Sequence, residues 1–270
     1  MFKTAFSLSP LKTNFGPMLF SGNLNEGFEV AKDLNYDGVE LSIRNPLDLD
    51  KKDIMERSRS LGLDIYAIAT GQSYYNDGFS FSAEDVNQRN NAIRRIKDNV
   101  DFAEILNCKI IIGGILGNIR EKFGSGSDNE KRVIDSFFPC LDYAKKKHVT
   151  ILFEPINRYE TLFINTIEEG KEFLKVFNYD NLKLIPDTFH MNIEESSLEK
   201  SLRDNIEFIG YIHLVDSNRR APGFGHTDFR SILKTLNETK YDGVICCEIL
   251  PLPDSFSAAK QAIRYIKSII

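Results

Sequence analysis

The stretch Thr150–Asp187, TILFEPINRYETLFINTIEEGKEFLKVFNYDNLKLIPD, carries the pattern that decides the fold. It begins with a short apolar run, Thr150–Phe153, and ends with a second one, Leu182–Pro186. Between them lies a segment whose apolar residues recur at helical spacing. A strand, a helix and a second strand in this order predict a parallel βαβ unit. Each expected strand is followed by an acidic residue, Glu154 or Asp187.

The same pattern repeats along the chain, with eight short apolar runs that each precede an amphipathic run. We expect strands at Thr4–Ser9, Gly38–Ile43, Leu63–Ala69, Lys109–Ile112, Thr150–Phe153, Leu182–Pro186, Tyr211–Val215 and Gly243–Glu248. We expect helices that begin near Asn23, Lys51, Asn87, Glu130, Ile167, Leu198, Phe229 and Phe256. Eight βα units in 270 residues predict an α/β fold, a single (β/α)8 TIM barrel domain over residues 1–270, because such barrels typically have about 250 residues.

Composition argues against several classes of protein. The net charge is −5, whereas nucleic-acid-binding domains usually carry a basic surplus, so we expect no nucleic-acid partner. The N-terminus lacks the apolar region of a signal peptide, and no run approaches the roughly 18 apolar residues of a membrane span. We therefore expect a cytoplasmic protein without a membrane partner. The four cysteines form no CxxC pair, and we interpret them as reduced and buried.

The most loop-like stretch is Gly117–Ser127, GNIREKFGSGS, which follows the fourth expected strand. The loops that follow the strands of a barrel carry its active site, so this stretch lies on the side where chemistry is expected. We interpret it as a lid over the site.

Each of the last four expected strands carries a metal-ligating residue type at or near its end. Glu154 and Asp187 follow the fifth and sixth strands, His213 lies in the seventh, and Glu248 ends the eighth. Because residues two apart in a strand share a face, Glu248 would lie above a small Cys246 in the barrel interior. Any one of the four could be a helix cap, an ion-pair partner or a structural histidine. Four on consecutive strands at one barrel end favour metal coordination.

Three carboxylates and one imidazole form an oxygen-rich site that suits hard divalent ions. We therefore expect one divalent metal per chain. Mn²⁺ is the first candidate, and such a site also accepts Mg²⁺, Co²⁺ or Zn²⁺. We expect no organic cofactor.

The segments around these ligands resemble the D-tagatose/D-psicose 3-epimerase family, which belongs to the xylose isomerase-like TIM barrels. The resemblance spans nearly the whole chain and is carried by EPINRYE (154–160), DTFHMNIEE (187–195), HLVDSNR (213–219), APGFGHTD (221–228) and EILP (248–251). Within the family, the branch that includes a 5-keto-L-gluconate epimerase is resembled by ATGQS (69–73), FINT (163–166) and LPLP (250–253).

The resemblance implies a role for each site residue. The metal ligands would be Glu154, Asp187, His213 and Glu248, and the first and last would also form the catalytic acid/base pair. The substrate's oxygens would be bound by Glu160, His190 and Arg219. The resemblance also implies an isomerase that epimerises carbohydrates and a homo-oligomer, either a dimer or a tetramer. The family's ketohexose enzymes line the distal pocket with tryptophan, whereas this chain has none.

Epimerisation next to a ketone requires that a proton leaves one face of the carbon and that another returns on the opposite face. Two bases are therefore needed, and Glu154 and Glu248 can flank a bound ketose. A positioned acid or base contributes roughly 10²–10⁴-fold. A metal that acts as a Lewis acid on the carbonyl and the neighbouring hydroxyl supplies the rest by stabilising the enediolate. The expected reaction is a two-base epimerisation of a keto sugar or keto sugar acid.

Some residues have structural alternatives. Arg219 could form an ion pair with Asp216 or Asp228, and His190 could be a buried structural histidine. His148 precedes the fifth strand, so we expect it at the far end of the barrel, away from the chemistry.

Three further residues are candidates for the pocket. Gly71 and Gln72 follow the third strand, and Arg44 follows the second. Arg44 or Arg120 could pair with the carboxylate of a sugar acid, a contact for which arginine is suited, or each could be a solvated surface side chain.

Three other functions fit such a barrel. A three-zinc AP endonuclease needs many histidines, whereas this chain has four and none before His148. An aldose–ketose isomerase could use the same four ligands, and the position at which solvent deuterium enters the sugar separates it from an epimerase. A non-catalytic sugar-binding barrel would not need an acid/base pair.

We expect a free, unphosphorylated substrate of about six carbons. No Gly-rich loop opens a helix after the seventh or eighth strand, where barrels often bind phosphate. Asp228 follows the Gly-bearing loop 222–225 and would repel phosphate. The missing tryptophan and the resemblance to the 5-keto-L-gluconate branch favour a charged or polar distal end.

Overall fold

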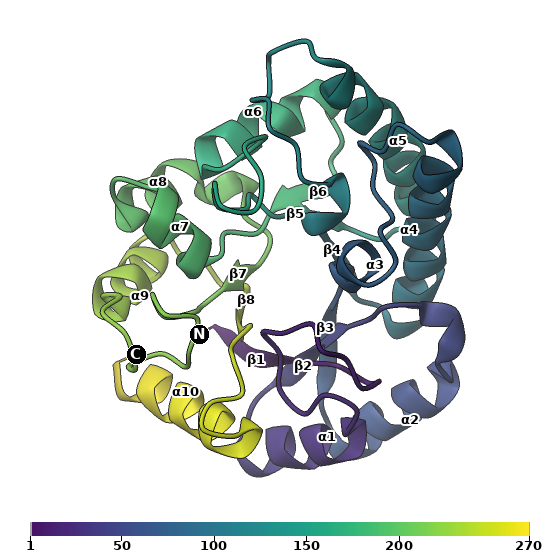
Figure 1. Cartoon of the computed structure of the whole chain (residues 1–270). Coiled ribbons are helices and arrows are strands. Elements are labelled where there is room, and N and C mark those ends of the chain that lie inside the picture. Colours follow the sequence, from purple (N-terminus) through teal and green to yellow (C-terminus); the bar gives the residue numbers. More distant parts are fainter. Residues whose placement is uncertain (1, 270) are drawn as a thin grey trace.

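The computed structural model describes residues 2–269 as a ring of strands surrounded by helices (Figure 1). The strands are β1 (Lys3–Leu8), β2 (Gly38–Ser42), β3 (Asp64–Ala69), β4 (Lys109–Ile112), β5 (Ile151–Phe153), β6 (Leu182–Leu184), β7 (Ile212–His213) and β8 (Val244–Cys247). Each strand is followed by at least one helix. The prediction of a (β/α)8 TIM barrel is confirmed.

The described helices are α1 (Leu24–Asp33), α2 (Lys51–Leu61), α3 (Gln72–Tyr75), α4 (Val86–Leu106), α5 (Asp128–Lys146), α6 (Ile167–Phe177), α7 (Thr188–Glu194), α8 (Leu198–Asn205), α9 (Phe229–Glu238) and α10 (Ser255–Ile269). The short helices α3 and α7, which lie directly behind strand ends, were not predicted. Within residues 2–269, no helix combines the length and the hydropathy that a membrane crossing requires.

The strands are all parallel and pair in the order β6-β5-β4-β3-β2-β1-β8-β7. Two single parallel bridges close the ring between β6 and β7, joining Leu184 to Ile209 and Asp187 to His213. Across this junction, the peptide N–H of His213 donates to the carbonyl of Pro186. The closure of the ring therefore brings two of the four predicted metal ligands side by side.

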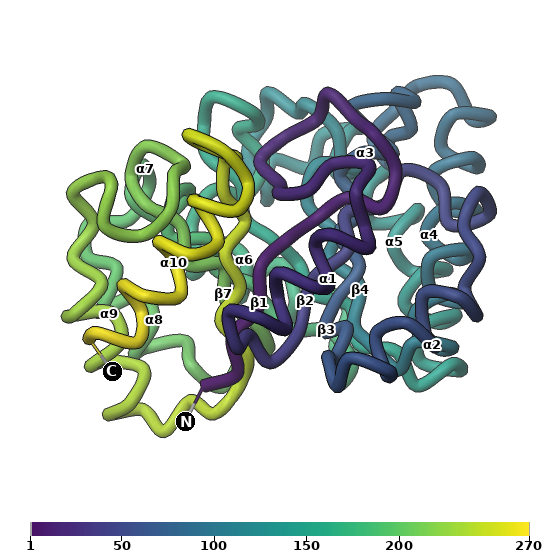
Figure 2. The backbone as a smooth tube through the Cα atoms, turned by 90° about the horizontal axis from the view of Figure 1, so that it is seen from below, coloured from purple at the N-terminus to yellow at the C-terminus, as the bar shows by residue number. Residues whose placement is uncertain are grey.

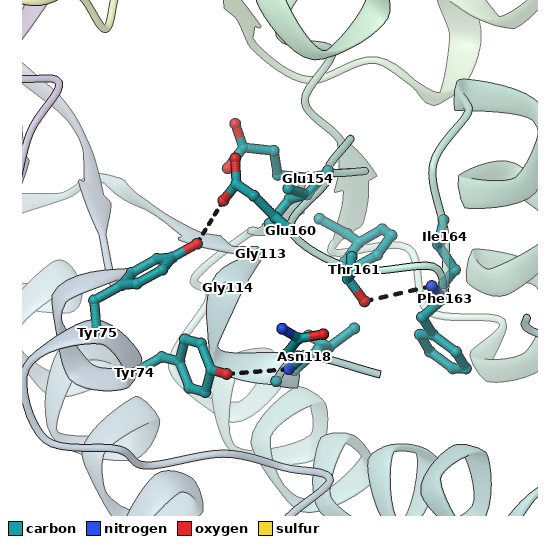
Figure 3. A pocket seen from close by; sticks show the side chains of 14 residues that line it. Tyr74, Tyr75, Gly113, Gly114, Asn118, Glu154, Glu160, Thr161, Phe163 and Ile164 are labelled. Carbon is teal, nitrogen blue, oxygen red and sulfur yellow. Dashed lines mark hydrogen bonds between the residues drawn. The ribbon is translucent and has the colours of Figure 1, made fainter. Parts of the chain in front are cut away.

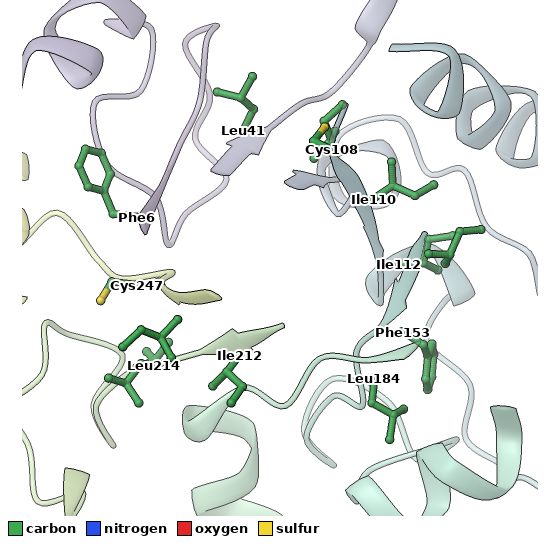
Figure 4. Close-up of a cluster of buried hydrophobic side chains, with 14 of the residues drawn as sticks. Phe6, Leu41, Cys108, Ile110, Ile112, Phe153, Leu184, Ile212, Leu214 and Cys247 are labelled. Atoms are coloured by element: carbon green, nitrogen blue, oxygen red, sulfur yellow. The ribbon is translucent and has the colours of Figure 1, made fainter. Parts of the chain in front are cut away.

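Side chains that point away from the barrel axis pack against the helices and form the main hydrophobic core (Figure 4). In α6, the Phe173 ring lies 4.9 Å from that of Phe153 and also packs against Phe123 and Phe137. Because Phe153 directly precedes Glu154, this aromatic packing holds the strand end that carries a predicted ligand.

Side chains that point toward the axis form a second cluster, and several of them are small. The members of this inner cluster are Ala5, Ala67, Ala69, Ile111, Leu152, Ile185, Tyr211, Val244 and Cys246. Cys246 is fully buried there, as predicted, and Glu248 follows two residues later at the barrel mouth. All four cysteines are buried and free.

The helix that follows β5 begins where the sequence predicts, because its first turn is capped. The hydroxyl of Thr166 accepts from the peptide N–H of Glu169, and the Glu169 carboxylate accepts from the peptide N–H of Thr166. This reciprocal capping box satisfies two N–H groups that a helix start otherwise leaves unpaired.

The carboxyl ends of the strands lie together at one end of the barrel, as do α3 and the loop after β1 (Figure 2). The loop Gly117–Ser127 is docked at this rim. The peptide N–H of Phe123 donates to the carbonyl of Phe163, and that of Leu162 donates to the carbonyl of Ile119. In this conformation the loop is part of the rim and not a detached lid.

We predict that Phe173→Ala destabilises the barrel by about 3–5 kcal/mol, because it leaves a cavity in a fully buried aromatic cluster. The measurement is the midpoint of urea unfolding followed by circular dichroism. The control is Val176→Ala on the same helix, where the side chain is 43% exposed and the expected change is within about 0.5 kcal/mol. Equal effects of the two substitutions would contradict this account of the core.

Candidate functional site

Glu154, Asp187, His213 and Glu248 come together at the barrel mouth, where one ligand atom from each lies within 4.8 Å of the others. Glu154 and Glu248 directly follow β5 and β8, His213 ends β7, and Asp187 is the N-cap of α7 behind β6. Asp187, His213 and Glu248 are buried, and 11% of the Glu154 side chain is exposed. The four residues that the strand ends predict therefore form one cluster.

Three buried atoms in this cluster have no hydrogen-bond partner: Glu154 Oε1, Asp187 Oδ2 and His213 Nδ1. The imidazole nitrogen lies 3.4 Å from the Glu154 oxygen and 4.0 Å from the Asp187 oxygen. Buried polar atoms are normally paired, because desolvation without compensation is costly. A divalent cation would be a shared partner for all three, and three carboxylates with one imidazole suit a hard ion. The residues present therefore fit a divalent metal.

His213 contacts Glu40 of β2, a residue that the sequence analysis missed. The His213 Nε2 lies 2.9 Å from the Glu40 Oε2, and neither side chain is exposed. Burial lowers the pKa of His213, but the Glu40, Glu154 and Glu248 carboxylates outweigh it and raise this pKa well above its usual value.

The carboxylates of the cluster are electrostatically strained when no cation balances them. Burial, together with the charge of Glu154, raises the pKa of Asp187 to about 7. Burial also raises the pKa of Glu248 to about 8, and the charges of Glu154 and Asp187 add to this shift. A bound cation favours the charged form of each group and would oppose these shifts.

A cavity of about 360 Å³ opens above the cluster. Its wall includes Glu154 and Glu248 together with the three predicted substrate-binding residues, Glu160, His190 and Arg219. The rest of the wall includes Asn14, Phe15, Gly16, Thr70, Gly71, Tyr75, Gly113 and Gly114. Among the described residues that line the cavity, Arg219 is the only arginine or lysine.

His190 faces the cavity as a neutral donor. Its Nδ1 accepts from the peptide N–H of Asn157 at 3.3 Å and lies 2.7 Å from the Asn157 side-chain nitrogen. The proton of the neutral ring is therefore on Nε2, which lies 3.9 Å from Asp187 Oδ2. Burial lowers the pKa of His190 well below its usual value, and the nearby charge of Arg219 adds to this effect.

Arg219 is paired with residues of the site. Its Nη2 donates to Glu248 Oε2 at 3.2 Å, and its Nη1 lies 3.8 Å from Glu160 Oε1. Asp216, the alternative partner weighed from the sequence, instead accepts from the peptide N–H groups of Ser217, Gly223, Gly225 and Thr227. The guanidinium of Arg219 is therefore held at the mouth of the cavity.

Glu160 is held by Tyr75 of α3, a second residue that the sequence analysis missed. Figure 3 shows the two side chains pointing toward each other, and the Tyr75 hydroxyl donates to Glu160 Oε2 at 2.5 Å. Asn157 donates to the other carboxylate oxygen at 3.2 Å. Burial and the charge of Glu160 raise the pKa of Tyr75, which keeps its hydroxyl protonated as a donor.

Two weaker candidates are not brought into the cavity, and the structure corrects them. Gln72 is buried, and its amide donates to the carbonyl of Ser42 at 2.9 Å, so it ties the ends of neighbouring strands together. The Arg44 guanidinium bonds to Asp77 at 2.5 and 2.8 Å on the surface. Arg120, the other arginine considered for a sugar acid, is exposed and is absent from the described lining. Of the three added candidates, only Gly71 lines the cavity.

His148 lies where the sequence predicts, in a separate depression at the opposite end of the barrel with Asp64, Tyr66 and Lys109. Among the residues that the sequence analysis did not identify, Glu40 could have been recognised as a candidate from the sequence. It is the one charged residue in the strand GVELS (38–42), whose other members are apolar or small. Tyr75 and Asn157 left no such signal, because their partners become neighbours only in the fold.

Known proteins with a similar sequence or fold show the family of this chain. Residues 28–269 match the family described as xylose isomerase-like TIM barrel. The chain is 31% identical over 214 residues to L-ribulose 3-epimerase of Methylomonas sp. (strain DH-1), a match that covers 79% of this chain and 73% of that protein. It is 25% identical over 236 residues to 3-dehydro-D-guloside 4-epimerase of Escherichia coli (strain K12), with coverage of 85% and 88%.

Among solved structures, an L-ribulose 3-epimerase matches with a TM-score of 0.82 at 25% identity, over 99% of this chain and 94% of that chain. The relatives confirm the predicted resemblance to the ketose 3-epimerases and the expectation of an enzyme of the carbohydrate epimerase class. The chain belongs to the xylose isomerase-like TIM barrel family.

Proposed function

We propose that the chain is a divalent-metal-dependent epimerase that inverts the carbon next to the ketone of a keto sugar. The observation that carries this proposal is the convergence of three unpartnered buried atoms, on Glu154, Asp187 and His213, beside Glu248. Glu154 and Glu248 also line a cavity of about 360 Å³. The activities named for the relatives, a 3-epimerase and a 4-epimerase of sugars, support the same class of reaction.

We propose that Glu154, Asp187, His213 and Glu248 hold one ion per chain, with Mn²⁺ as the first candidate and no organic cofactor. When bound, the ion would act as a Lewis acid that stabilises negative charge on the ketone oxygen and its neighbour.

Glu154 and Glu248 are suited to exchange protons with opposite faces of the same carbon. They follow β5 and β8, which lie on different sides of the closed ring, and both line the cavity. One carboxylate removes the proton from carbon, and the other, in its protonated form, returns a proton to the opposite face.

Arg219 and His190 would stabilise negative charge on the substrate's oxygens during this exchange. The Arg219 guanidinium lies beside Glu248, and the neutral His190 presents its Nε2–H near Asp187. Glu160 is held between Tyr75 and Arg219, so its carboxylate is oriented to accept from a sugar hydroxyl.

We propose that the substrate is uncharged. The pairing of Arg44 with Asp77 leaves the described cavity wall with one cationic side chain, Arg219, and that side chain is engaged by Glu160 and Glu248. The carboxylate of a sugar acid would find no unpaired arginine or lysine in the described cavity wall. A neutral keto sugar therefore fits the wall better than the sugar acid favoured by the sequence.

Removal of metal should abolish turnover, because the cluster then lacks the charge that stabilises the intermediate. We expect loss of activity after dialysis against chelator and recovery with one Mn²⁺ or Co²⁺ per chain, measured by epimerisation assay and metal analysis. Full activity in protein shown by metal analysis to be free of divalent ions would overturn the metal-dependent mechanism.

Glu154→Gln and Glu248→Gln should each lower kcat by roughly 10²–10⁴-fold or more, because each face of the carbon needs its own base. Glu168→Gln, on the exposed surface of α6, is the matched control and should retain full turnover. Circular dichroism checks that each variant is folded. Near-native kcat in either site variant would show that the residue is not a base.

The substrate prediction is tested by comparing kcat/KM for neutral ketohexoses and ketopentoses with that for keto-hexonates in the presence of Mn²⁺. We expect a clear preference for the neutral sugars that Arg44→Ala leaves unchanged. A preference for the keto-hexonates would refute the uncharged substrate and keep the epimerase. Solvent deuterium that enters only in conversion between aldose and ketose would point to an isomerase instead.

A further inference from the structure

Glu40 is a buried carboxylate that takes no part in the proposed reaction. It lies in β2 between Val39 and Leu41, which both belong to the outer core. Because successive side chains of a strand point to opposite faces, Glu40 points into the barrel. It is fully buried and is absent from the described lining of the cavity, so it is not placed to exchange a proton with a sugar.

Burial of the Glu40 carboxylate is unfavourable unless a contact with its partner compensates for the lost hydration. Its Oε2 lies 2.9 Å from His213 Nε2, whereas its Oε1 is buried without any hydrogen-bond partner. Removing a carboxylate from water without full compensation is strongly unfavourable. An apolar side chain of similar size would fill the same space without that cost. The contact with His213 is therefore the feature that explains a carboxylate at this position.

The strands around Glu40 are arranged so that it reaches across the barrel. Its partners in the parallel register are Ser7 on β1 and Ala67 on β3, which are both small. The pairing of β2 with β3 shifts register between Val39 and Glu40. Such irregularities recur beside active sites, where they re-aim a side chain. The irregularity and the small neighbours together direct Glu40 toward His213 on β7.

His213 needs such a partner because an imidazole binds a metal only through an unprotonated nitrogen. In the neutral ring, one nitrogen carries the proton, and a hydrogen bond at that nitrogen selects the tautomer. The Nε2 of His213 faces Glu40, and its Nδ1 faces Glu154 and Asp187. An acceptor on the Nε2 side therefore leaves Nδ1 free to be a ligand.

We propose that Glu40 is a positioning residue of the metal centre, which holds His213 with its proton on Nε2 and its Nδ1 directed at the ion. This inference rests on the proposed metal binding. Glu40 acts only through His213 and contacts neither the metal nor the substrate. Partners of this kind raise the basicity of the ligand, and their loss typically lowers metal affinity by roughly 10–100-fold.

The test compares Glu40→Leu and Glu40→Gln with Tyr211→Phe. Tyr211 lies in the same inner cluster with an unpartnered hydroxyl, so Tyr211→Phe controls for a polar group removed from the barrel interior. Calorimetric titration with Mn²⁺ gives the affinity of each folded protein. NMR of ¹⁵N-labelled imidazoles in the Zn²⁺-loaded protein reports the tautomer, which is tractable because the chain has four histidines.

We expect Glu40→Leu to weaken Mn²⁺ binding by roughly 10–100-fold and Glu40→Gln to weaken it less, with wild-type affinity in Tyr211→Phe. The Nε2–H signature of His213 should be present in wild type and lost or mixed in Glu40→Leu. Metal-free Glu40→Leu should be at least as heat-stable as wild type, because an apolar residue removes a buried charge. If Glu40→Leu does not fold, the affinity and tautomer of Glu40→Gln carry the test.

Unchanged affinity and tautomer in a folded Glu40 variant would overturn the positioning role and leave the epimerase intact. A fall in metal uptake that matches a loss of folded protein by circular dichroism would assign Glu40 a merely structural role. Failure of the wild-type protein to bind any divalent ion would instead overturn the proposed function, and this inference with it.

Discussion

The mutual repulsion of three carboxylates at the barrel mouth is the constraint on which the rest of the site depends. Glu154, Asp187 and Glu248 lie within 4.8 Å of one another in a largely buried setting, where like charges interact strongly. Such a cluster persists only when the surrounding structure holds each group in place. Here the packing of Phe153 on Phe173, the capping of α7 by Asp187 and the closing bridge from Asp187 to β7 provide that support. The packing and hydrogen bonds of the barrel thus hold together negative charges that a cation can balance.

The two halves of the chain contribute different kinds of residue to the site. All four candidate ligands follow or end β5 to β8, whereas the first half of the chain supplies residues that orient them or shape the cavity. Glu40 on β2 reaches His213, and Tyr75 behind β3 reaches Glu160. Because the ring is closed, residues far apart in the chain face each other across it, and support for a ligand comes from the opposite side of the barrel.

This geometry explains what the sequence could and could not predict. The succession of strands and the four candidate ligands could be predicted, because each ligand stands at or near the end of an apolar run. The partner of Arg44 was not readable, because Asp77 becomes its neighbour only through the fold of the segment around α3. The role of Glu40 was also hidden, since its contact with His213 joins residues 173 positions apart. Local patterns predict which side chains reach the barrel mouth, and only the tertiary contacts decide which of them are already paired.

The candidate metal ligands and the residues that would select the substrate come from different parts of the fold. The ligand cluster is fixed by four strand ends, whereas the far wall of the cavity includes residues from the loops that follow β1 and β3, among them Phe15 and Tyr75. Their rings are stacked 4.8 Å apart, and Tyr75 also bonds to Glu160. In a chain without tryptophan, this tyrosine and phenylalanine pair supplies the aromatic surface of that wall. A change in either loop would therefore alter the wall and, through Tyr75, the orientation of Glu160, while the four candidate ligands keep their places at the strand ends.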